Sequence, residues 1–274
     1  MPALHPKHIH GIEGQDPLWE RIREETRIAI AGEAILASFM HATILHHEEL
    51  ESALSFHLAN QLDSPSASSM MLRDVFLEAF SSDETTRRAI RDDLNAVLER
   101  DSACHEYHLP FLYFKGFHAL QIHRVGHWLW QQGRHSLALF LQSRMAQKFA
   151  IDIHPAAILG HGILLDHGSG LVVGETAVVG NRVSILQSVT LGGTGKVDGD
   201  RHPKIGDGVL ISAGAKILGN IRVGEGAKVG AGSVVLKDVP PHTTVAGVPA
   251  RVVGVPTSEN PALDMDHDFP ESDW

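Results

Sequence analysis

Cysteine is almost absent from this chain of 274 residues, with Cys104 as the only one. A disulfide framework within the chain is therefore excluded, and a reducing cytoplasm is the expected compartment. Long apolar runs are also missing, since no stretch approaches the roughly 20 residues that a membrane-spanning helix needs. The first residues lack the apolar core of a signal peptide. These absences predict a cytoplasmic protein without a membrane partner.

Positive charge is in the minority, because 23 lysines and arginines are set against 33 acidic residues. The resulting net charge of -10 argues against a general affinity for nucleic acid or anionic lipid. Hydrophobic residues make up 43% of the chain, which is enough to bury a core in each of two domains. We therefore expect a folded two-domain protein that does not bind nucleic acid.

Glycine is abundant in one half only: 6 of the 26 precede Asp152, and the other 20 lie between Gly160 and Gly254. The same half carries an aliphatic residue at every sixth position, a period that fits neither an α-helix nor an amphipathic strand. Fixed repeats of this kind are typical of a parallel β-helix, in which each repeat supplies one short strand and one corner. The repeated positions are Ile153, Leu159, Leu165, Leu171, Ala177, Val183 and Val189, then Ile205, Ile211, Ile217, Val223, Val229 and Val235.

The residues before 151 have a different pattern, with apolar positions at helical spacing, as at Leu18, Trp19 and Ile22. The predicted fold class is therefore α+β, with an α-helical domain over residues 1–150 followed by a parallel β-helix over residues 151–254. Residues 255–274 are acidic and contain proline, so a disordered tail is predicted there.

The six-residue repeat is interrupted once, between Val189 and Ile205, where about ten extra residues are inserted into the solenoid. A binding loop is usually inserted at such an interruption, and we place it at residues 192–204. Near its end stand Arg201 and His202, which offer more chemistry than a solvated excursion needs. The loop is therefore predicted to bind a ligand.

Candidate catalytic groups lie just before the loop, at Asp152 and at Asp166-His167. In a prism with three hexapeptides per coil, residues about 18 apart stack on one another, which would place Gly170 over Asp152. His167 would then lie three residues back on the same side, and this spacing permits a carboxylate–imidazole pair. An imidazole held by a carboxylate is a common general base near neutral pH.

Zinc binding is the alternative use of the histidines at His154, His161 and His167. Their spacings of seven and six residues place them on successive sides of the prism, and Cys104 is the only thiol. We therefore expect no metal site within one chain, although ligands from neighbouring subunits stay open.

Several strings resemble one known family: DIHPA from Asp152, LDHG from Leu165, SILQSVTLGGTGK from Ser184, DRHPK from Asp200 and AGVPAR from Ala246. With KGFHAL and GHWLW in the helical part, they resemble bacterial serine O-acetyltransferase, of the hexapeptide-repeat acyltransferases. The resemblance implies transfer of acetyl from acetyl-CoA to L-serine, giving O-acetyl-L-serine and CoA in cysteine biosynthesis. It also implies a left-handed β-helix, homotrimers packed prism to prism, and hexamers joined as dimers of trimers through the helical domains.

The same resemblance implies roles for the candidate residues. His167 is the general base that takes the proton from the serine hydroxyl, and Asp152 orients it. The remaining serine contacts are Asp101 and Asp166 for the ammonium, and Arg201 and His202 for the carboxylate. The helical domain thus supplies part of the serine site. Feedback inhibition by L-cysteine is expected because an isosteric thiol would fit the same groups.

Acetyl-CoA is expected as a co-substrate, with no permanently bound cofactor. In the family pattern it runs along the outside of the prism between neighbouring subunits, where small side chains let a ligand lie against the backbone. The expected contacts are Gly193, Thr194, Ala213, Ala231, Lys228 and Arg251. The C-terminus departs from the family, because many members end in an isoleucine that docks into cysteine synthase, whereas this chain ends in Trp274. We expect a complex with that synthase to be weak or absent.

Two other functions stay open on the residues alone. An acetyltransferase for a sugar or another hydroxyl acceptor would share the fold and the base, but it would not need paired groups for an ammonium and a carboxylate. Asp166 together with Arg201 and His202 favours serine. A non-catalytic trimeric scaffold would not depend on His167.

Overall fold

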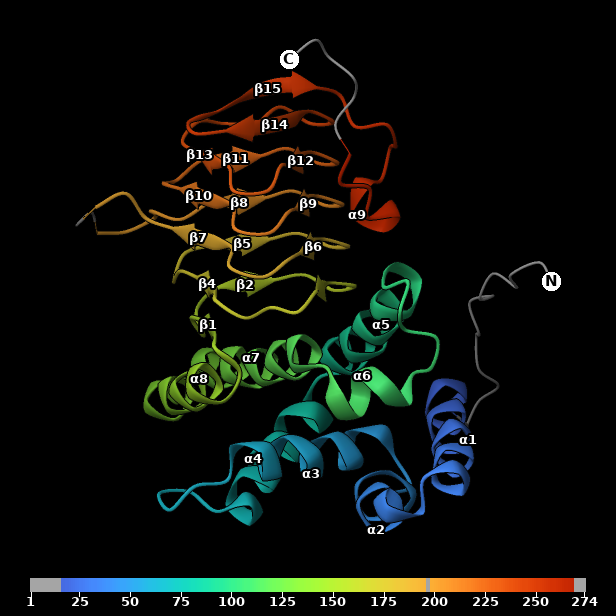
Figure 1. Cartoon of the computed structure of the whole chain (residues 1–274). Helices are drawn as coiled ribbons and strands as arrows, with labels where there is room; N and C mark the ends of the chain where they lie inside the picture. Colours follow the sequence, from blue (N-terminus) through green and yellow to red (C-terminus); the bar gives the residue numbers. More distant parts are fainter. Residues whose placement is uncertain (1–15, 196–197, 269–274) are drawn as a thin grey trace, which may run out of the picture.

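The computed structural model describes residues 16–195 and 198–268, in which a helical part supports an upright β-solenoid (Figure 1). The helices are α1 (Pro17–Gly32), η1 (Ala34–Leu36), α2 (Ala37–Met40), η2 (His41–Leu45), α3 (Leu50–Leu62), α4 (Ser69–Ser82), α5 (Glu84–Arg100), α6 (His108–Tyr113), α7 (Lys115–Gln131), α8 (His135–Phe149) and α9 (Pro261–Asp264). The expected order of a helical domain followed by a parallel β-solenoid is confirmed.

The solenoid consists of fifteen short strands among the described residues. They are β1 (Ile151–Ile153), β2 (Ile158–Leu159), β3 (Leu164–Leu165), β4 (Leu171–Val173), β5 (Val178–Val179), β6 (Ser184–Ile185), β7 (Thr190–Gly192), β8 (Lys204–Ile205), β9 (Leu210–Ile211), β10 (Lys216–Leu218), β11 (Arg222–Val223), β12 (Lys228–Val229), β13 (Val234–Val235), β14 (Thr244–Gly247) and β15 (Ala250–Gly254). Successive strands turn from one face of the prism to the next, so every third strand stacks.

Three sheets form the faces of the prism. The first sheet has the order β1-β4-β7-β10-β13, the second β11-β8-β5-β2, and the third β15-β14-β12-β9-β6-β3. All pairs are parallel except β14 with β15, which closes the far end as an antiparallel hairpin. The inward residues of the three sheets form the solenoid core, and twelve of the thirteen repeated aliphatic positions are buried, with Leu159 partly buried.

The coils are not all of one length, and this corrects two expectations. Val173 pairs with Leu191, a regular step of 18 residues, but Ile153 pairs with Val173, a step of 20. The two extra residues fall in the corner between β3 and β4. Asp152 therefore stacks on Val172 and not on Gly170, so the expected stacking was wrong.

The inserted loop is also shorter than expected. Leu191 pairs with Ile217 across a step of 26 residues, which is eight more than a regular coil. An insertion of ten residues assumes that Val189 is the stacking position, whereas the residue that stacks on Ile217 is Leu191, two residues later. Because Val189 and Leu191 are both fully buried, either could have been taken as the repeated position.

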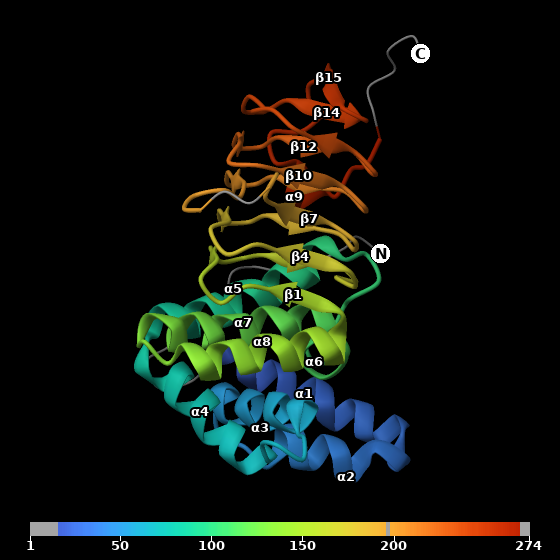
Figure 2. The same ribbon diagram turned by 90° about the vertical axis from the view of Figure 1, so that its left-hand side faces the viewer.

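The helical part and the solenoid share one continuous apolar core. Helix α8 ends at Phe149, and its C-terminal cap Ala150 has a left-handed conformation, with φ of 56°, from which the chain passes directly into β1. Helices α7 and α8 lie across the base of the solenoid (Figure 2). The solenoid is therefore held at a defined position on the helices by packed side chains.

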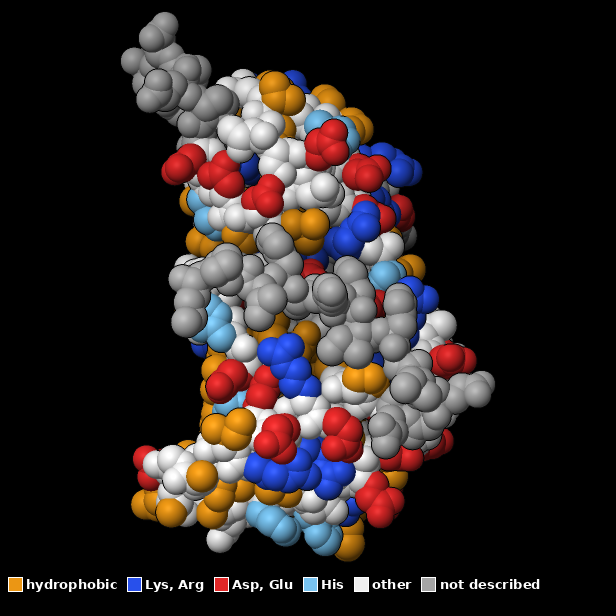
Figure 3. Space-filling model, turned by 90° about the vertical axis from the view of Figure 1, so that its right-hand side faces the viewer, with side chains coloured by type: hydrophobic (Ala, Val, Ile, Leu, Met, Phe, Trp, Pro, Cys, Tyr) orange, Lys and Arg blue, Asp and Glu red, His pale blue; other side chains and the backbone are white. Residues whose placement is uncertain are grey.

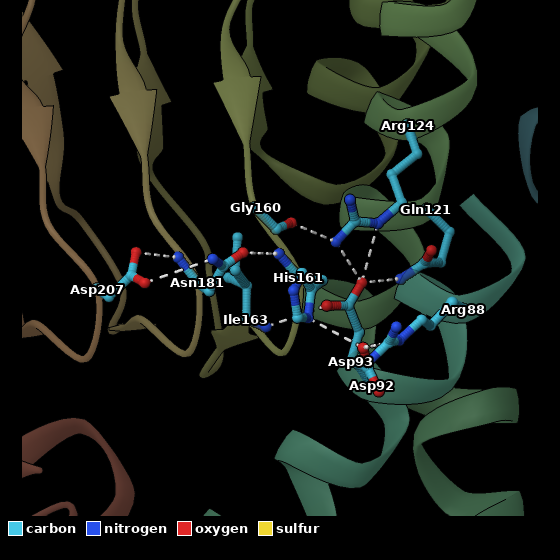
Figure 4. Close-up of polar contacts among 10 residues, drawn as sticks. All are labelled: Arg88, Asp92, Asp93, Gln121, Arg124, Gly160, His161, Ile163, Asn181 and Asp207. Carbon is cyan, nitrogen blue, oxygen red and sulfur yellow. Dashed lines mark hydrogen bonds and ion pairs between the residues drawn. The ribbon is translucent and has the colours of Figure 1, made fainter. Parts of the chain in front are cut away.

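A buried carboxylate joins the two parts (Figure 4). Asp93 of α5 is fully buried and accepts hydrogen bonds from Arg124 and Gln121 of α7 and from the backbone N–H of Ile163 in the solenoid. Arg124 also donates to the carbonyl of Gly160 at 2.8 Å. Burial raises the pKa of the Asp93 carboxyl, while the charge of Arg124 acts in the opposite direction. The network is satisfied only when helices and solenoid are docked.

The segment after β15 packs on the body up to residue 268, in place of the disorder that was predicted. Ala262 of α9 is fully buried, and its carbonyl accepts a hydrogen bond of 2.8 Å from Ser184 Oγ. Lys228 Nζ donates to the Asp268 carbonyl, and Ser212 Oγ contacts His267 Nδ1 at 3.0 Å. Composition could not reveal these tertiary partners. The final residues, 269–274, lie outside the described part of the chain.

Charged side chains of both signs lie close together on the surface. Ion pairs of α1 join Arg21 to Glu25 and Arg27 to Glu24, and on the face shown in Figure 3 basic side chains are intermixed with acidic ones. No helix within the described ranges is both long and apolar enough to cross a membrane.

Candidate active site

The corner between β3 and β4 carries His167. The backbone is left-handed at His167, with φ of 55°, and again at Gly168 and Gly170. Such a conformation is uncommon for a residue with a side chain. It leaves the His167 side chain 74% exposed beside Asp166, with 3.9 Å between His167 Nε2 and Asp166 Oδ1. The two extra residues of this coil thus form a protruding corner that presents an imidazole to solvent.

Helix α7 supports this corner from below. A β-carbon built on Gly116 would lie 1.9 Å from the carbonyl oxygen of Leu165, so only glycine permits the approach. Lys115 Nζ donates to Ser169 Oγ, two positions after His167 in the chain. The KGFHAL string therefore holds the His167 corner in place through its first two residues.

Asp152 lies in the middle of β1, between the inward side chains of Ile151 and Ile153, so its carboxylate faces outward. Gln142 of α8 donates a hydrogen bond of 2.7 Å to Asp152 Oδ1. Among the described residues, no hydrogen bond connects Asp152 to His167. The pair predicted from the sequence is therefore not formed within one chain.

Asp101 ends α5 as its C-terminal cap, and Asp101 Oδ1 accepts a hydrogen bond of 2.9 Å from the Ala103 N–H. The neighbouring Cys104 packs with Leu164 of β3 in a small apolar cluster. Because Leu164 is two residues before Asp166, this packing places the Asp101 turn on the side of the solenoid that carries the His167 corner.

Arg201 and His202 belong to the loop between β7 and β8. They are held against a second corner, formed by Glu175 and Thr176 between β4 and β5. Arg201 Nη2 donates to Glu175 Oε2 at 2.6 Å, and this hydrogen bond lowers the pKa of Glu175. His202 is 7% exposed, and its ring lies against Gly174, where a β-carbon would come within 2.1 Å of it. Burial, followed by the charge of Arg201, lowers the pKa of His202. The corner therefore combines a fixed cation with a neutral imidazole.

The two corners flank one strand. The His167 corner precedes β4 and the Glu175 corner follows it, so the two lie at opposite ends of this strand. From Gly170 to Gly174 an extended chain covers about 13 Å at 3.3 Å per residue. Within one chain, the groups predicted for the two ends of serine are therefore far apart.

The residues predicted for acetyl-CoA fall into two groups. Ala213 and Ala231 lie on stacked corners, where the Gly232 N–H donates to the Ala213 carbonyl at 2.8 Å. Gly193 and Thr194 stand at the start of the loop, and a β-carbon on Gly219 would lie 3.3 Å from the Thr194 methyl group. At both the stacked corners and the start of the loop, small side chains leave the backbone accessible to a ligand.

The two predicted basic contacts differ from each other. Lys228 is 2% exposed, because the C-terminal segment covers it, and its ammonium lies 4.0 Å from Asp266. Burial lowers its pKa, while Asp266 acts in the opposite direction. Arg251 is exposed on β15, and within the described part of the chain it donates only to the adjacent Ala250 carbonyl.

The three histidines weighed as zinc ligands do not converge. His161 forms an ion pair of 2.9 Å with Asp92, and His154 packs edge-on against Trp130. The described ranges contain no group of three or more side chains arranged to hold a metal ion.

Three residues near these groups were missed by the sequence reasoning: Gln142, Glu175 and Thr176. Glu175 and Thr176 stand 26 residues before Arg201 and His202, which is the step of the coil with the loop. That spacing was the available signal, but it requires the loop length to be known. Gln142 has no such signal, because helix-to-strand contacts are not periodic.

Two family sequence patterns match this chain. The one described as "Serine acetyltransferase, N-terminal" matches residues 18–122, and "Bacterial transferase hexapeptide (six repeats)" matches residues 202–237. Over 252 residues the chain is 60% identical to a serine acetyltransferase of Escherichia coli, covering 92% of each chain. The chain belongs to the serine acetyltransferase family.

Solved structures of serine acetyltransferases agree with this assignment. A soybean enzyme complexed with serine is 62% identical, with a TM-score of 0.85, over 86% of this chain and 97% of that one. One in complex with cysteine is 52% identical, with a TM-score of 0.90, over 92% and 98%. One from Brucella abortus in complex with coenzyme A is 52% identical, with a TM-score of 0.88, over 90% and 98%.

As a serine acetyltransferase, the chain is an acyltransferase that uses acetyl-CoA as its co-substrate and serine as the acceptor. The resemblance read from the strings at Asp152, Ser184 and Asp200 is confirmed. The alternatives of a sugar acetyltransferase and of a non-catalytic scaffold are set aside.

Proposed function

We propose that serine is acetylated at a site assembled from two copies of this chain, with the His167 corner of one copy facing the Arg201 corner of the next. The observation that carries this proposal is the placement of the two corners at opposite ends of β4. An amino acid is too small to bridge them within one chain. Homotrimers packed prism to prism, joined in pairs through the helical parts, would bring such corners together.

His167 is the general base in this proposal. Its imidazole takes the proton from the serine hydroxyl as the oxygen attacks the thioester carbonyl of acetyl-CoA. The tetrahedral intermediate then expels the CoA thiolate, which receives the proton from the imidazolium, so the base is regenerated. Asp152 orients the imidazole across the subunit contact, and Gln142 keeps its carboxylate facing outward.

The substrate's two charges are bound from opposite sides. Asp101 and Asp166, on the His167 side, hold the ammonium, whereas Arg201 and His202 hold the carboxylate. The Glu175 carboxylate accepts a hydrogen bond from the Arg201 guanidinium and so fixes its position. Other N–H groups of the guanidinium stay available for a charge-assisted hydrogen bond to the serine carboxylate. L-cysteine differs from serine only by a thiol in place of the hydroxyl, and a related enzyme has been solved in complex with cysteine. Feedback inhibition at this site follows.

Acetyl-CoA binds along the groove between neighbouring solenoids. The bare backbone at Gly193, Thr194, Ala213 and Ala231 suits the pantetheine arm, and a relative has been solved with coenzyme A. Arg251 is available for a phosphate group as it stands. Contact between Lys228 and a phosphate group requires the C-terminal segment to move, because Asp266 and Asp268 cover this lysine. The compartment proposed for this reaction is the cytoplasm.

Subunit mixing tests the shared site. His167→Ala and Arg201→Ala are expected to be inactive alone, with turnover reduced roughly 10²- to 10⁴-fold for the base variant. Co-expressed in equal amounts, the two variants should recover about one quarter of the wild-type activity. An active site then needs the Arg201→Ala chain on the side that supplies His167 and the His167→Ala chain on the side that supplies Arg201. Activity is measured as CoA release with L-serine, and D-serine and L-homoserine serve as acceptor controls.

The matched control mixes His167→Ala with the double variant His167→Ala/Arg201→Ala, which leaves no intact base in any site. Recovery confined to the first mixture supports a site shared between copies. Failure of the first mixture to recover activity, although mixed oligomers are isolated by two different tags, would mean that each chain carries its own complete site.

A further inference from the structure

The hydroxyl of Thr176 is the centre of the second corner. Thr176 Oγ1 accepts a hydrogen bond of 3.0 Å from the Arg201 N–H and one of 3.1 Å from the His202 N–H. A hydroxyl oxygen has two acceptor positions and one hydrogen to donate. Both acceptor positions are therefore used by the end of the loop, and only the hydrogen remains.

That hydrogen is directed to the imidazole of His202. Thr176 Oγ1 lies 2.9 Å from His202 Nδ1, and the Thr176 backbone N–H donates to the same nitrogen at 3.1 Å. Two donors on one side allow no hydrogen on Nδ1. A neutral imidazole carries one N–H, so in His202 it must be Nε2–H.

Asp200 is the competing acceptor for the Thr176 hydroxyl. The hydrogen bond from Lys204 has the largest effect in lowering the pKa of the Asp200 carboxyl, and a hydrogen bond from Thr176 lowers it further. The carboxylate of Asp200 already accepts from Lys204 at 2.5 Å and from Asn220 at 3.2 Å. The backbone N–H of Thr176 in any case keeps Nδ1 as an acceptor. The tautomer therefore does not depend on the hydroxyl alone.

His202 Nε2 has no hydrogen-bonding partner among the described residues, and it lies beside Gly174 and Gly193, which have no side chains to cover it. Arg201 stands next to it along the chain. An N–H donor and a guanidinium are thus presented together, which suits the two oxygens of a carboxylate.

We propose that Thr176 is a positioning residue that fixes His202 as its Nε2–H tautomer, so that serine meets a neutral donor beside the Arg201 cation. This inference rests on the proposed function, in which His202 binds the substrate carboxylate. It adds a residue whose side chain touches no substrate and acts on serine through the imidazole. Its effect should therefore fall on serine binding and leave the thioester chemistry unchanged.

A double-mutant cycle tests the inference. Thr176→Val keeps the shape and the backbone N–H but removes the hydroxyl, whereas Thr176→Ser keeps the hydroxyl and is the matched control. Thr176→Val should raise the KM for L-serine about tenfold, because the His202 ring then keeps only one of the two donors that hold its Nδ1, with kcat and the KM for acetyl-CoA within about threefold. Thr176→Ser should stay within about twofold of wild type for all three.

The cycle is closed in the His202→Ala background. If Thr176 acts through the imidazole, adding Thr176→Val there should change the KM for serine by less than about twofold. Independent, multiplicative effects would overturn the inference and assign Thr176 a structural role in the loop. If His202→Ala leaves the KM for serine unchanged, the proposed role of His202 fails and the inference fails with it.

A measurement on the unmodified chain protects the test against a variant that does not fold. In the histidine-labelled enzyme, the ring signals missing from His202→Asn identify His202 by nitrogen NMR. We expect a protonated Nε2 and an unprotonated Nδ1 at neutral pH. A protonated Nδ1 would overturn the inference directly.

Discussion

Gly116, at the start of α7, approaches Leu165 so closely that a β-carbon at position 116 would lie 1.9 Å from the Leu165 carbonyl oxygen. Only Asp166 separates Leu165 from His167, so the position of the candidate base depends on a contact between backbone atoms of the helical part and of the solenoid. The helical part is therefore a component of the active site as well as a support.

Gly116→Ala should displace the His167 corner. The methyl group cannot be accommodated without a shift of α7 or of β3, because the obstructing atom belongs to the backbone. We expect kcat to fall about 10- to 100-fold, since small misplacements of reacting groups have large effects on rate. Gly126→Ala, on the same helix, is the control, because its β-carbon would make an ordinary contact of 3.8 Å with Pro155. Equal kinetics for the two variants would contradict the prediction.

Gln142→Leu should release the Asp152 carboxylate. The side-chain hydrogen bond of 2.7 Å is lost, while the size of the residue is nearly kept. If Asp152 orients the base, kcat should fall several-fold to about tenfold, and the KM for serine should change less. Gln147→Leu, on the exposed side of α8, is the control. A steady-state comparison with serine as the varied substrate measures both parameters.

The buried imidazole of His57 should make the helical part sensitive to acid. Burial lowers its pKa to about 4. As the pH falls from 6.5 toward 4, the unfolded chain takes up a proton at this position while the folded chain does not. The free energy of unfolding therefore falls through this window, by about 3 kcal/mol in total at this site. His118 in the same core adds to the effect, with its pKa lowered to about 3.

His57→Gln should flatten this dependence. Glutamine stays uncharged and keeps a donor for the Leu112 carbonyl, which the imidazole contacts at 3.1 Å. Urea unfolding at pH 7 and pH 4.5 should show a smaller loss of stability in the variant than in the wild type. Exposed His46→Gln is the control. A pH slope in His57→Gln as steep as in wild type would assign the acid sensitivity to other groups.

Ala262→Asp should detach the C-terminal segment from the third sheet. The Ala262 side chain is fully buried, and a carboxylate placed there would lose its hydration. We expect faster proteolysis and faster hydrogen exchange across residues 257–268, with the melting of the body nearly unchanged. Leu263→Asp, at a partly buried position, should show a weaker effect. Protection equal to that of wild type would mean that other contacts hold the segment.

The solenoid could be predicted from the sequence, because its core is a local and repeated property. An aliphatic residue at each sixth position and glycine at the corners are visible without any knowledge of pairing. The register could not be predicted, because each strand directs two side chains inward, two residues apart. Leu171 and Val173 are both buried, so the six-residue count can slip by two without losing a match.

The two-residue error in the predicted register affected the predicted site. It concealed the two extra residues that lift His167 out of the prism, and it placed Gly170 over Asp152 where Val172 stacks. The strings around His167 and Arg201 identified the family correctly. They could not show that the two residues lie at corners at opposite ends of β4, since that depends on which strands pair.

By itself, the sequence determined the repeating core, the division into a helical part and a solenoid, and the types of side chain available for catalysis. These depend on the periodicity and identity of residues close together in the chain. Only the tertiary structure decided which of them meet: Gln142 with Asp152, Thr176 with His202, and Gly116 with Leu165. Such contacts are set by packing between segments remote in sequence, and no local pattern encodes them.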